Sequence, residues 1–286
     1  MINPVPFALA LGSLFVLLLV AEHVVRLRPP TRPLLARLVV NGVISLLAFS
    51  AAAVFVRPAT LAALRWTSDT PFGLVHVVPS TAAQFVVAFL LMDLTFYWWH
   101  VANHRIAVLW RFHNVHHIDP DLDVSTAFRF HFGEVGLSAA FRAVQVVAIG
   151  PPLWMFASYE LVFQASTLFH HSNLRLPIQF ERLLNLVLVT PRMHGIHHSQ
   201  VRNETNSNYS VVFSWWDRVH RTATLNVPQA SVAIGVPAYT APDDHRLSST
   251  LLLPFRPQRD YWRRADGTVP CRDRAAASNG NVWLAE

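Results

Sequence analysis

The sequence predicts an all-α, multi-pass integral membrane protein with a cytoplasmic, histidine-rich site for two metal ions. Three observations support this prediction. Of the 286 residues, 52% are hydrophobic and only 14% are charged, which is too few charges to cover the surface of a water-soluble fold. Several uncharged stretches reach the roughly 20 residues that a helix needs to cross a bilayer. Fifteen histidines, most of them in spaced clusters, accompany only 10 glycines.

The N-terminal region, residues 1–79, is expected to contribute two spans. Residues 2–21 carry no charge and are expected to form a retained anchor, because no basic segment precedes them and no small-residue cleavage pattern follows. An arginine-rich loop broken by prolines comes next, and residues 38–56 form a second uncharged stretch. By the positive-inside bias this loop faces the cytoplasm, so residues 57–79 are expected on the opposite side.

The central region, residues 80–225, is expected to hold the third span and a hairpin. Residues 80–100 form an apolar segment whose single acid is Asp93. A longer apolar stretch, residues 133–169, is interrupted by Gly150, Pro151 and Pro152, which predicts two helices that enter the membrane and return. The segments on either side of this hairpin should then emerge on one face. Residues 226–286 show no period and are expected to form a polar, partly ordered C-terminal tail.

Histidines recur at helical spacing along the central region. The third span ends in W-W-H-V-A-N-H, which places His100 and His104 on one helical face, where two imidazoles can chelate one ion. The pattern H-x-x-H-H then occurs twice, with F-H-H-S-N between the copies. The second copy follows Thr190 as a helix N-cap and Pro191 as the first helical residue. These motifs contain His113, His116, His117, His170, His171, His194, His197 and His198.

So many imidazoles at one membrane face predict metal binding, because without a cation they would suffer desolvation and mutual repulsion. One ion takes about four to six ligands, so these histidines are enough for two ions. Imidazole suits iron, zinc, copper and nickel, and the ligand type leaves the metal open. Asp93, seven residues before His100, shares its helical face. It is expected either to orient a ligand imidazole through the second ring nitrogen or to cap or solvate a helix end.

The motifs and their flanking residues resemble those of the fatty acid hydroxylase and sterol desaturase superfamily of membrane di-iron oxygenases. The resemblance covers residues 86–222. It rests on the segments D-L-T-F-Y-W-W-H-V-A-N-H-R, L-W-R-F-H-N-V-H-H, T-A-F-R-F-H-F-G-E, F-H-H-S-N-L-R-L-P, T-P-R-M-H-G-I-H-H-S, S-N-Y-S and S-W-W-D-R. The sequence departs from the family pattern after Asp217, where the usual glycine is missing and His220 is an extra histidine, expected at the surface.

The resemblance implies two non-haem irons held by the histidine motifs. Its ligand set is His100, His104, His113, His116, His117, His171, His194, His197 and His198, with His131 of the R-F-H-x-x-E stretch and His170 as lower-ranked candidates. It further implies O2 as co-substrate and a fatty acid or sterol-like lipid as the substrate, which is hydroxylated or desaturated. Since no flavin, nicotinamide or haem-attachment motif is present, electrons are expected from a separate reductase, ferredoxin or cytochrome.

Three other classes of membrane protein stay open at this point. A zinc-dependent hydrolase would need a general base beside its ligands, but Val, Ala, Asn, Gly and Ile fill the motifs. A metal transporter would place its ligands at mid-membrane, and a bis-imidazole haem protein would pair histidines across helices.

The single cysteine, Cys271, excludes a disulfide framework. The net charge of +6 comes from scattered arginines, which argues against nucleic acid and favours contact with anionic lipid.

Overall fold

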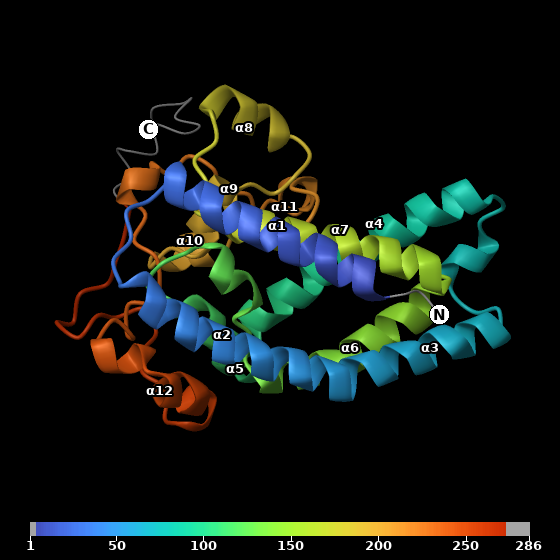
Figure 1. Ribbon diagram of the computed structural model, residues 1–286, viewed down its shortest axis with the longest axis horizontal. Coiled ribbons are helices and arrows are strands. Elements are labelled where there is room, and N and C mark those ends of the chain that lie inside the picture. Colours follow the sequence, from blue (N-terminus) through green and yellow to red (C-terminus); the bar gives the residue numbers. More distant parts are fainter. Residues whose placement is uncertain (1–3, 273–286) are drawn as a thin grey trace.

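The computed structural model describes residues 4–272, and these residues form helices and loops with no β-strand among them (Figure 1). Four helical stretches are long and apolar enough to cross a membrane: Val5–Val24, Leu34–Val77, Thr81–Arg105 and Phe132–Ile149. The predicted all-α fold with several apolar helices of spanning length is confirmed.

The second span is longer than the sequence predicted. Helix α1 covers Pro4–Val24, and α2 covers Leu34–Ala51 but continues through a π-helical turn, Ala52–Val56, into α3, Arg57–Asp69. Residues 57–69 therefore continue this helix beyond residue 56, the predicted end of the second uncharged stretch. A proline inside a helix lacks the N–H that the helix needs, and the π turn lies directly before Pro58, so the backbone passes the proline without a break.

Helices α4, Thr81–Arg105, and α5, Ala107–His117, carry the first two histidine motifs. The Ser80 hydroxyl caps α4 by accepting a hydrogen bond from the Ala83 N–H at 3.2 Å. The helix runs five residues past the predicted end at His100, so His104 also lies on it. Both motifs consequently stand on rigid helical turns.

The predicted hairpin is present as α6, Phe132–Ile149, and α7, Leu153–His171. Gly150 ends α6 with a left-handed φ of 71°, and an added Cβ would lie 2.2 Å from the Phe72 carbonyl oxygen, so both backbone shape and space require glycine. Pro151 and Pro152 then restart the chain. By length and composition α6 could span a membrane, whereas α7 is not among the four such stretches.

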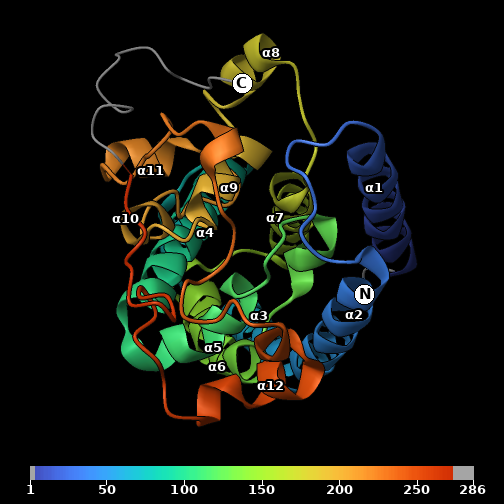
Figure 2. The ribbon, with the colours of Figure 1, turned by 90° about the vertical axis from the view of Figure 1, so that its left-hand side faces the viewer.

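Short helices gather at the histidine-bearing ends of α4 and α7, opposite the turn that joins α6 to α7 (Figures 1 and 2). They are Val124–Phe128, α8 (Ile178–Leu184), α9 (Pro191–His197), α10 (Arg202–Thr205), α11 (Trp215–Val219) and α12 (Leu247–Leu252). The arginine-rich loop between α1 and α2 lies at this same end, because the Leu27 N–H donates to the Asn173 carbonyl at 2.8 Å.

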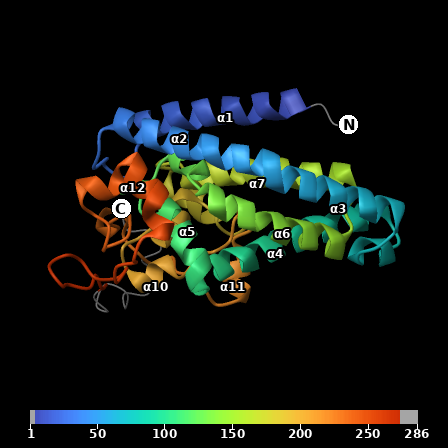
Figure 3. The same ribbon diagram turned by 90° about the horizontal axis from the view of Figure 1, so that it is seen from below.

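The C-terminal segment is part of the core, so the prediction of a partly ordered appendage is wrong for its described portion. Val236, Tyr239 and Leu253 pack in one buried cluster with Ile44 of α2 and Trp110 of α5. Figure 3 shows this segment folded back beside α2 and α5. Its apolar residues are too widely spaced to give a periodic pattern. The remainder of the predicted tail, residues 273–286, lies outside the described residues.

Candidate metal centre

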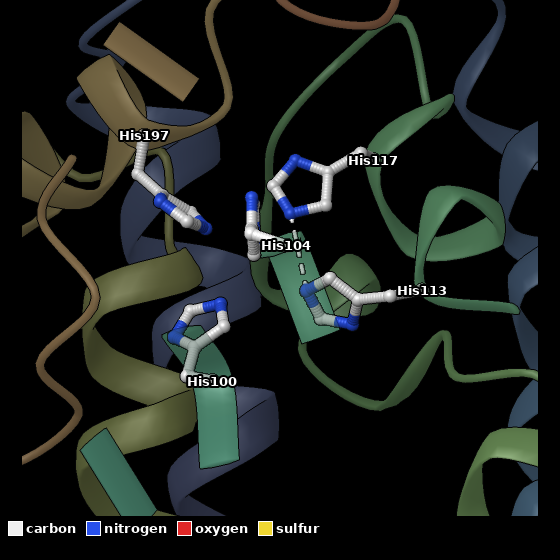
Figure 4. A group of neighbouring side chains, drawn as sticks. All are labelled: His100, His104, His113, His117 and His197. Carbon is white, nitrogen blue, oxygen red and sulfur yellow. Dashed lines mark hydrogen bonds between the residues drawn. The ribbon is translucent and has the colours of Figure 1, made fainter. Parts of the chain in front are cut away.

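Nine of the predicted ligand histidines converge in two groups at the ends of α4, α5, α7 and α9. Within each group, one nitrogen of every ring lies within 4.8 Å of the others. The first group, with rings from α4, α5 and α9 around one space, is seen in Figure 4. It contains His100, His104, His113, His117 and His197, and the second group contains His116, His171, His194 and His198.

The H-x-x-H-H pattern connects the two groups. In each copy the two consecutive histidines belong to different groups, because successive residues on a helix point about 100° apart. His117 belongs to the first group and His116 to the second. Likewise, His197 belongs to the first group and His198 to the second. The rings of His117 and His198 stack 4.3 Å apart, so the two groups are immediate neighbours.

The nitrogen positions fit bound metal ions. His171 Nε2 lies 3.1 Å from His116 Nε2 and 3.0 Å from His194 Nε2. Metal–nitrogen bonds of about 2.0–2.1 Å place neighbouring ligand nitrogens about 3.0–3.4 Å apart. His197 Nε2 and both nitrogens of His104 are buried without a hydrogen-bond partner among the described residues, which is costly unless a cation occupies the space. These two groups of imidazoles could therefore hold two metal ions.

Four rings are oriented through their outer nitrogen. His100 Nδ1 donates to the Tyr209 carbonyl at 2.7 Å, and His197 Nδ1 donates to the Ser207 carbonyl at 2.6 Å. Since a carbonyl can only accept, the Nδ1 proton is fixed there and Nε2 presents its lone pair to the group. His171 is held similarly by the Thr167 carbonyl at 2.8 Å.

Glu134 orients the fourth ring and was missed by the sequence analysis. Its Oε1 accepts from His113 Nδ1 at 2.8 Å, and both side chains are buried. Glu134 stands in the first turn of α6. The sequence signal for it is the R-F-H-F-G-E stretch, in which the histidine is a common metal ligand and the glutamate lies three residues later.

Asp217 positions the two carbonyls that orient the first group. Its carboxylate accepts from the Tyr209 N–H at 2.8 Å and the Ser210 N–H at 2.9 Å, and it is fully buried. These bonds fix the segment whose Tyr209 and Ser207 carbonyls meet His100 and His197. The S-N-Y-S and W-D segments are thus parts of one support for the site.

Asp93 does not orient a ligand imidazole. Within the described chain its hydrogen bonds go instead to the Phe213 N–H at 3.1 Å, the Val212 N–H at 3.4 Å and Trp216 Nε1 at 2.8 Å. The expectation failed because Asp93, although on the face of His100, lies two turns away along α4. Its role is to hold the segment before α11 against α4.

His131 and His170 lie outside both groups. His131 caps α6, because its Nδ1 accepts from the Gly133 N–H at 2.9 Å and its Nε2 donates to the Leu251 carbonyl at 3.1 Å. Both ring nitrogens are therefore used. His170 stacks beside His194 with ring centroids 4.2 Å apart, while its neighbour His171 joins the second group. His220, expected at the surface, is half-buried and stacks on Tyr97 at 4.7 Å.

A buried ion-pair network fixes the loop that follows α5. Arg37 of α2 contacts Asp119 at 2.8 Å and also pairs with Asp123. Although burial opposes the charged form, Arg37 and Arg129 hold the pKa of Asp119 well below its usual range. Arg129 also donates to the Val115 carbonyl at 3.0 Å, inside the second histidine motif. The network ties α2 to the end of α5, where His116 and His117 lie.

Burial favours the neutral form of several of these histidines, and the neutral form is the one that binds metal. It lowers the pKa of His197 to about 3 and holds those of His117, His194 and His198 well below the usual value, with neighbouring imidazoles adding to the effect.

An apolar cavity of about 540 Å³ reaches the two groups from the side of α2, α3, α6 and α7. Its walls include Ala48, Phe96, Trp99 and Phe156, and His100, His113, His116, His171 and His194 line its inner end. Its volume lies within the roughly 300–1,000 Å³ typical of small-molecule sites. The cavity can accommodate an alkyl chain whose carbons lie beside the imidazole groups.

Comparison with known proteins agrees with this geometry. Residues 85–222, which include all nine histidines, match the family model described as fatty acid hydroxylase. This stretch, just under half of the chain, is similar to the fatty acid hydroxylases. Helices α1–α3 and the C-terminal segment lie outside the matched residues.

The chain is also similar to proteins that are named as hydroxylases or monooxygenases. The chain is 31% identical over 155 residues to ornithine lipid hydroxylase OlsE of Rhizobium tropici, covering 54% of this chain and 46% of the relative. It is 29% identical over 136 residues to human alkylglycerol monooxygenase, covering 47% of this chain and 29% of the relative. It is 27% identical over 180 residues to human cholesterol 25-hydroxylase, covering 61% of this chain and 64% of the relative. The chain thus spans less than two thirds of each of these relatives. No solved structure matches the chain significantly.

Proposed function

We propose that the chain is a membrane-bound, O2-dependent di-iron oxidoreductase that hydroxylates or desaturates a lipid. The observation that carries this proposal is the pairing of two imidazole groups with an apolar cavity that ends on them. The relatives named above act, by their names, on an ornithine lipid, an alkylglycerol and cholesterol. These molecules share long apolar parts and differ in their polar groups, which supports a lipid as the substrate class.

The nine histidines of the two groups are the proposed iron ligands. Two bound irons, with O2 and electrons, supply the oxidation of an unactivated C–H bond. Zinc has no redox chemistry and would not serve an oxygenase. Among the redox-active metals that imidazole binds, we choose iron because the histidine motifs resemble those of membrane di-iron oxygenases. The protein's own contribution is to hold the Nδ1 protons of four rings on fixed acceptors, so that the ligand nitrogens cannot turn away.

The cavity positions the substrate and excludes water. Its apolar walls favour an alkyl chain over water by about 25 cal/mol for each Å² of apolar surface removed from solvent. Phe96 and Trp99 line it close to the histidines His100 and His113. A chain held there presents one of its carbons to the imidazole groups, and the position of that carbon depends on where the polar end of the lipid stops.

We place the histidine groups on the cytoplasmic face, with electrons delivered there by a separate reductase, ferredoxin or cytochrome. The arginine-rich loop between α1 and α2 supports this orientation, since basic loops favour the cytoplasm and this loop lies at the histidine end of the molecule.

The test is the metal content and the optical spectrum of the detergent-purified protein after expression in iron-replete medium. His113→Ala and His197→Ala remove one ligand each from the first group, and His131→Ala is the matched control outside both groups. We expect about two irons per chain in the parent and the control, with loss in both ligand variants. Lipids from cells with and without the gene should then differ by an added oxygen or a lost pair of hydrogens.

Zinc without iron in the purified parent would refute the proposal. So would lipid products that form equally well without O2.

A further inference from the structure

A second apolar cavity lies between α1 and α2 and adjoins the histidine cavity. Its volume is about 610 Å³, and its walls come from Phe7, Ala8, Leu11, Gly12 and Phe15 of α1 and from Leu38, Gly42, Ser45 and Phe49 of α2. Four residues line both cavities: Phe49, Phe128, Glu160 and Gln164. A molecule in the cleft between α1 and α2 is therefore in contact with the walls of the cavity that ends on the histidines.

The cleft is open because α1 packs on α7 and leaves space beside α2. Leu18 of α1 lies in a buried cluster with Leu168 of α7. Gly12 and Gly42 line the cleft from opposite sides, and an added Cβ at either would meet no atom within 4 Å. The outward faces of both helices carry exposed apolar side chains such as Val16 and Leu46. The cleft thus opens between two helices whose outer faces suit lipid.

Two aromatic rings stand at the junction of the two cavities. Phe49 is 52% exposed, and its ring centroid lies 5.1 Å from that of Phe128 at a tilt of 58°. An exposed side chain of this kind can change rotamer without unpacking the core. The side chains of this pair, rather than the backbone, narrow the space between the two cavities.

The polar groups at the junction are neutral or paired. Glu160 pairs with Arg142 of α6, which is buried and has Phe96 5.0 Å from its guanidinium carbon. Gln164, one turn further along α7, has no hydrogen-bond partner among the described residues, although it lies between apolar walls. A free amide in such surroundings offers a hydrogen bond to an uncharged polar group. A carboxylate at this place would lie near the Glu160 carboxylate, and Arg142 is already paired with Glu160.

We propose that the substrate is a bilayer-resident lipid with an uncharged hydrogen-bonding group, and that it enters sideways between α1 and α2. The alkyl chain passes Phe49 and Phe128 and reaches the histidine cavity, while the polar group stops at Gln164. This proposal rests on the proposed function for its substrate, but the route can be measured without any oxidation.

The experiment uses the metal-loaded protein in vesicles, without reductant so that no turnover occurs. A fatty alcohol with a fluorescent polyene chain is delivered from donor vesicles, and the rate of its uptake is followed by fluorescence. Gly12→Phe and Gly42→Phe fill the cleft from either side, and both replace a weak helix former. Leu46→Phe, at an exposed position of α2 that does not line the cleft, is the matched control. We expect each glycine variant to slow uptake about tenfold, as a blocked route does, with unchanged metal content and an unaffected control.

Unchanged uptake in both glycine variants would overturn the lateral route. A change of oligomeric mass in these variants would also overturn it, because the cleft would then be covered by a second copy of the chain. If the protein holds no iron or oxidises no lipid while the glycine variants still slow uptake, the proposed function fails and the route stands.

The polar part of the proposal has its own test. Gln164→Leu should weaken binding of the fatty alcohol about two- to tenfold, which corresponds to the loss of one neutral hydrogen bond. Binding of the matching alkane should not change. A free fatty acid that competes as well as the alcohol, or an alcohol affinity unaffected by Gln164→Leu, would overturn the assignment of an uncharged polar group.

Discussion

Glu134 should set the metal affinity of the first histidine group without being a ligand. Its Oε1 accepts the Nδ1 proton of His113 at 2.8 Å, with the two side chains only 7% and 3% exposed. Removing such an outer hydrogen-bond partner typically costs about 10- to 100-fold in metal affinity. This corresponds to about 1.4–2.7 kcal/mol, which agrees with the roughly 1.5–3 kcal/mol of a hydrogen bond to a charged group.

The assay compares Glu134→Ala and Glu134→Gln with the parent in titrations against a metal chelator. Alanine frees the His113 ring to turn, so we expect one of two metals to be lost at a 10- to 100-fold lower chelator concentration. Glutamine can still accept through its amide oxygen and should retain most of the affinity. The melting temperature of metal-free protein separates this effect from general unfolding. If Glu134→Ala holds both metals as tightly as the parent while His113→Ala loses one, the reasoning is refuted.

Three further predictions concern other parts of the site. His131→Ala should keep both metals but lose about 0.5–2 kcal/mol of unfolding free energy, the value of a helix cap, as measured by denaturant titration; loss of a metal would contradict the capping role. Asp93→Asn should leave metal content unchanged and lower stability by about 1–3 kcal/mol through its weakened bonds to the Val212 and Phe213 N–H groups, whereas a selective loss of metal would restore the original expectation. Burial lowers the pKa of His197 in the folded protein to about 3, whereas the ordinary pKa of a histidine is about 6.5. Below pH 6.5 the unfolded chain therefore binds more protons than the folded chain. Stability of the metal-free protein should therefore be constant above that pH and fall as pH drops from about 6.5 toward 3, and a melting temperature that rises on acidification would refute this.

The clustering of the candidate ligands could be predicted because each histidine motif is short and local. A spacing of three or four residues on a helix decides which imidazoles share a face, and the structure places all nine in two groups. The hairpin could also be predicted, because Gly150 and the two prolines after it leave the backbone few alternatives to a turn.

The supports of the site could not be predicted in the same way. Glu134 lies 21 residues from His113, and Asp93 lies more than 100 residues from the segment that it holds. Such pairs depend on how helices pack, which no local spacing reveals. Asp93 illustrates the difference. It lies on the face of His100 as the spacing predicts, but the position of the segment before α11 decides its hydrogen-bond partners.

The packing of the C-terminal segment on α5 determines when the centre can be completed during synthesis. Trp262 stacks on Trp110 with ring centroids 5.9 Å apart, and Trp110 in turn lies 4.8 Å from the His104 ring. The wall beside His104 is therefore missing until the ribosome has released residue 262, well after the apolar helices have entered the bilayer. We therefore expect a nascent chain stalled before this point to leave the His104 side of the first histidine group open to the surrounding solution.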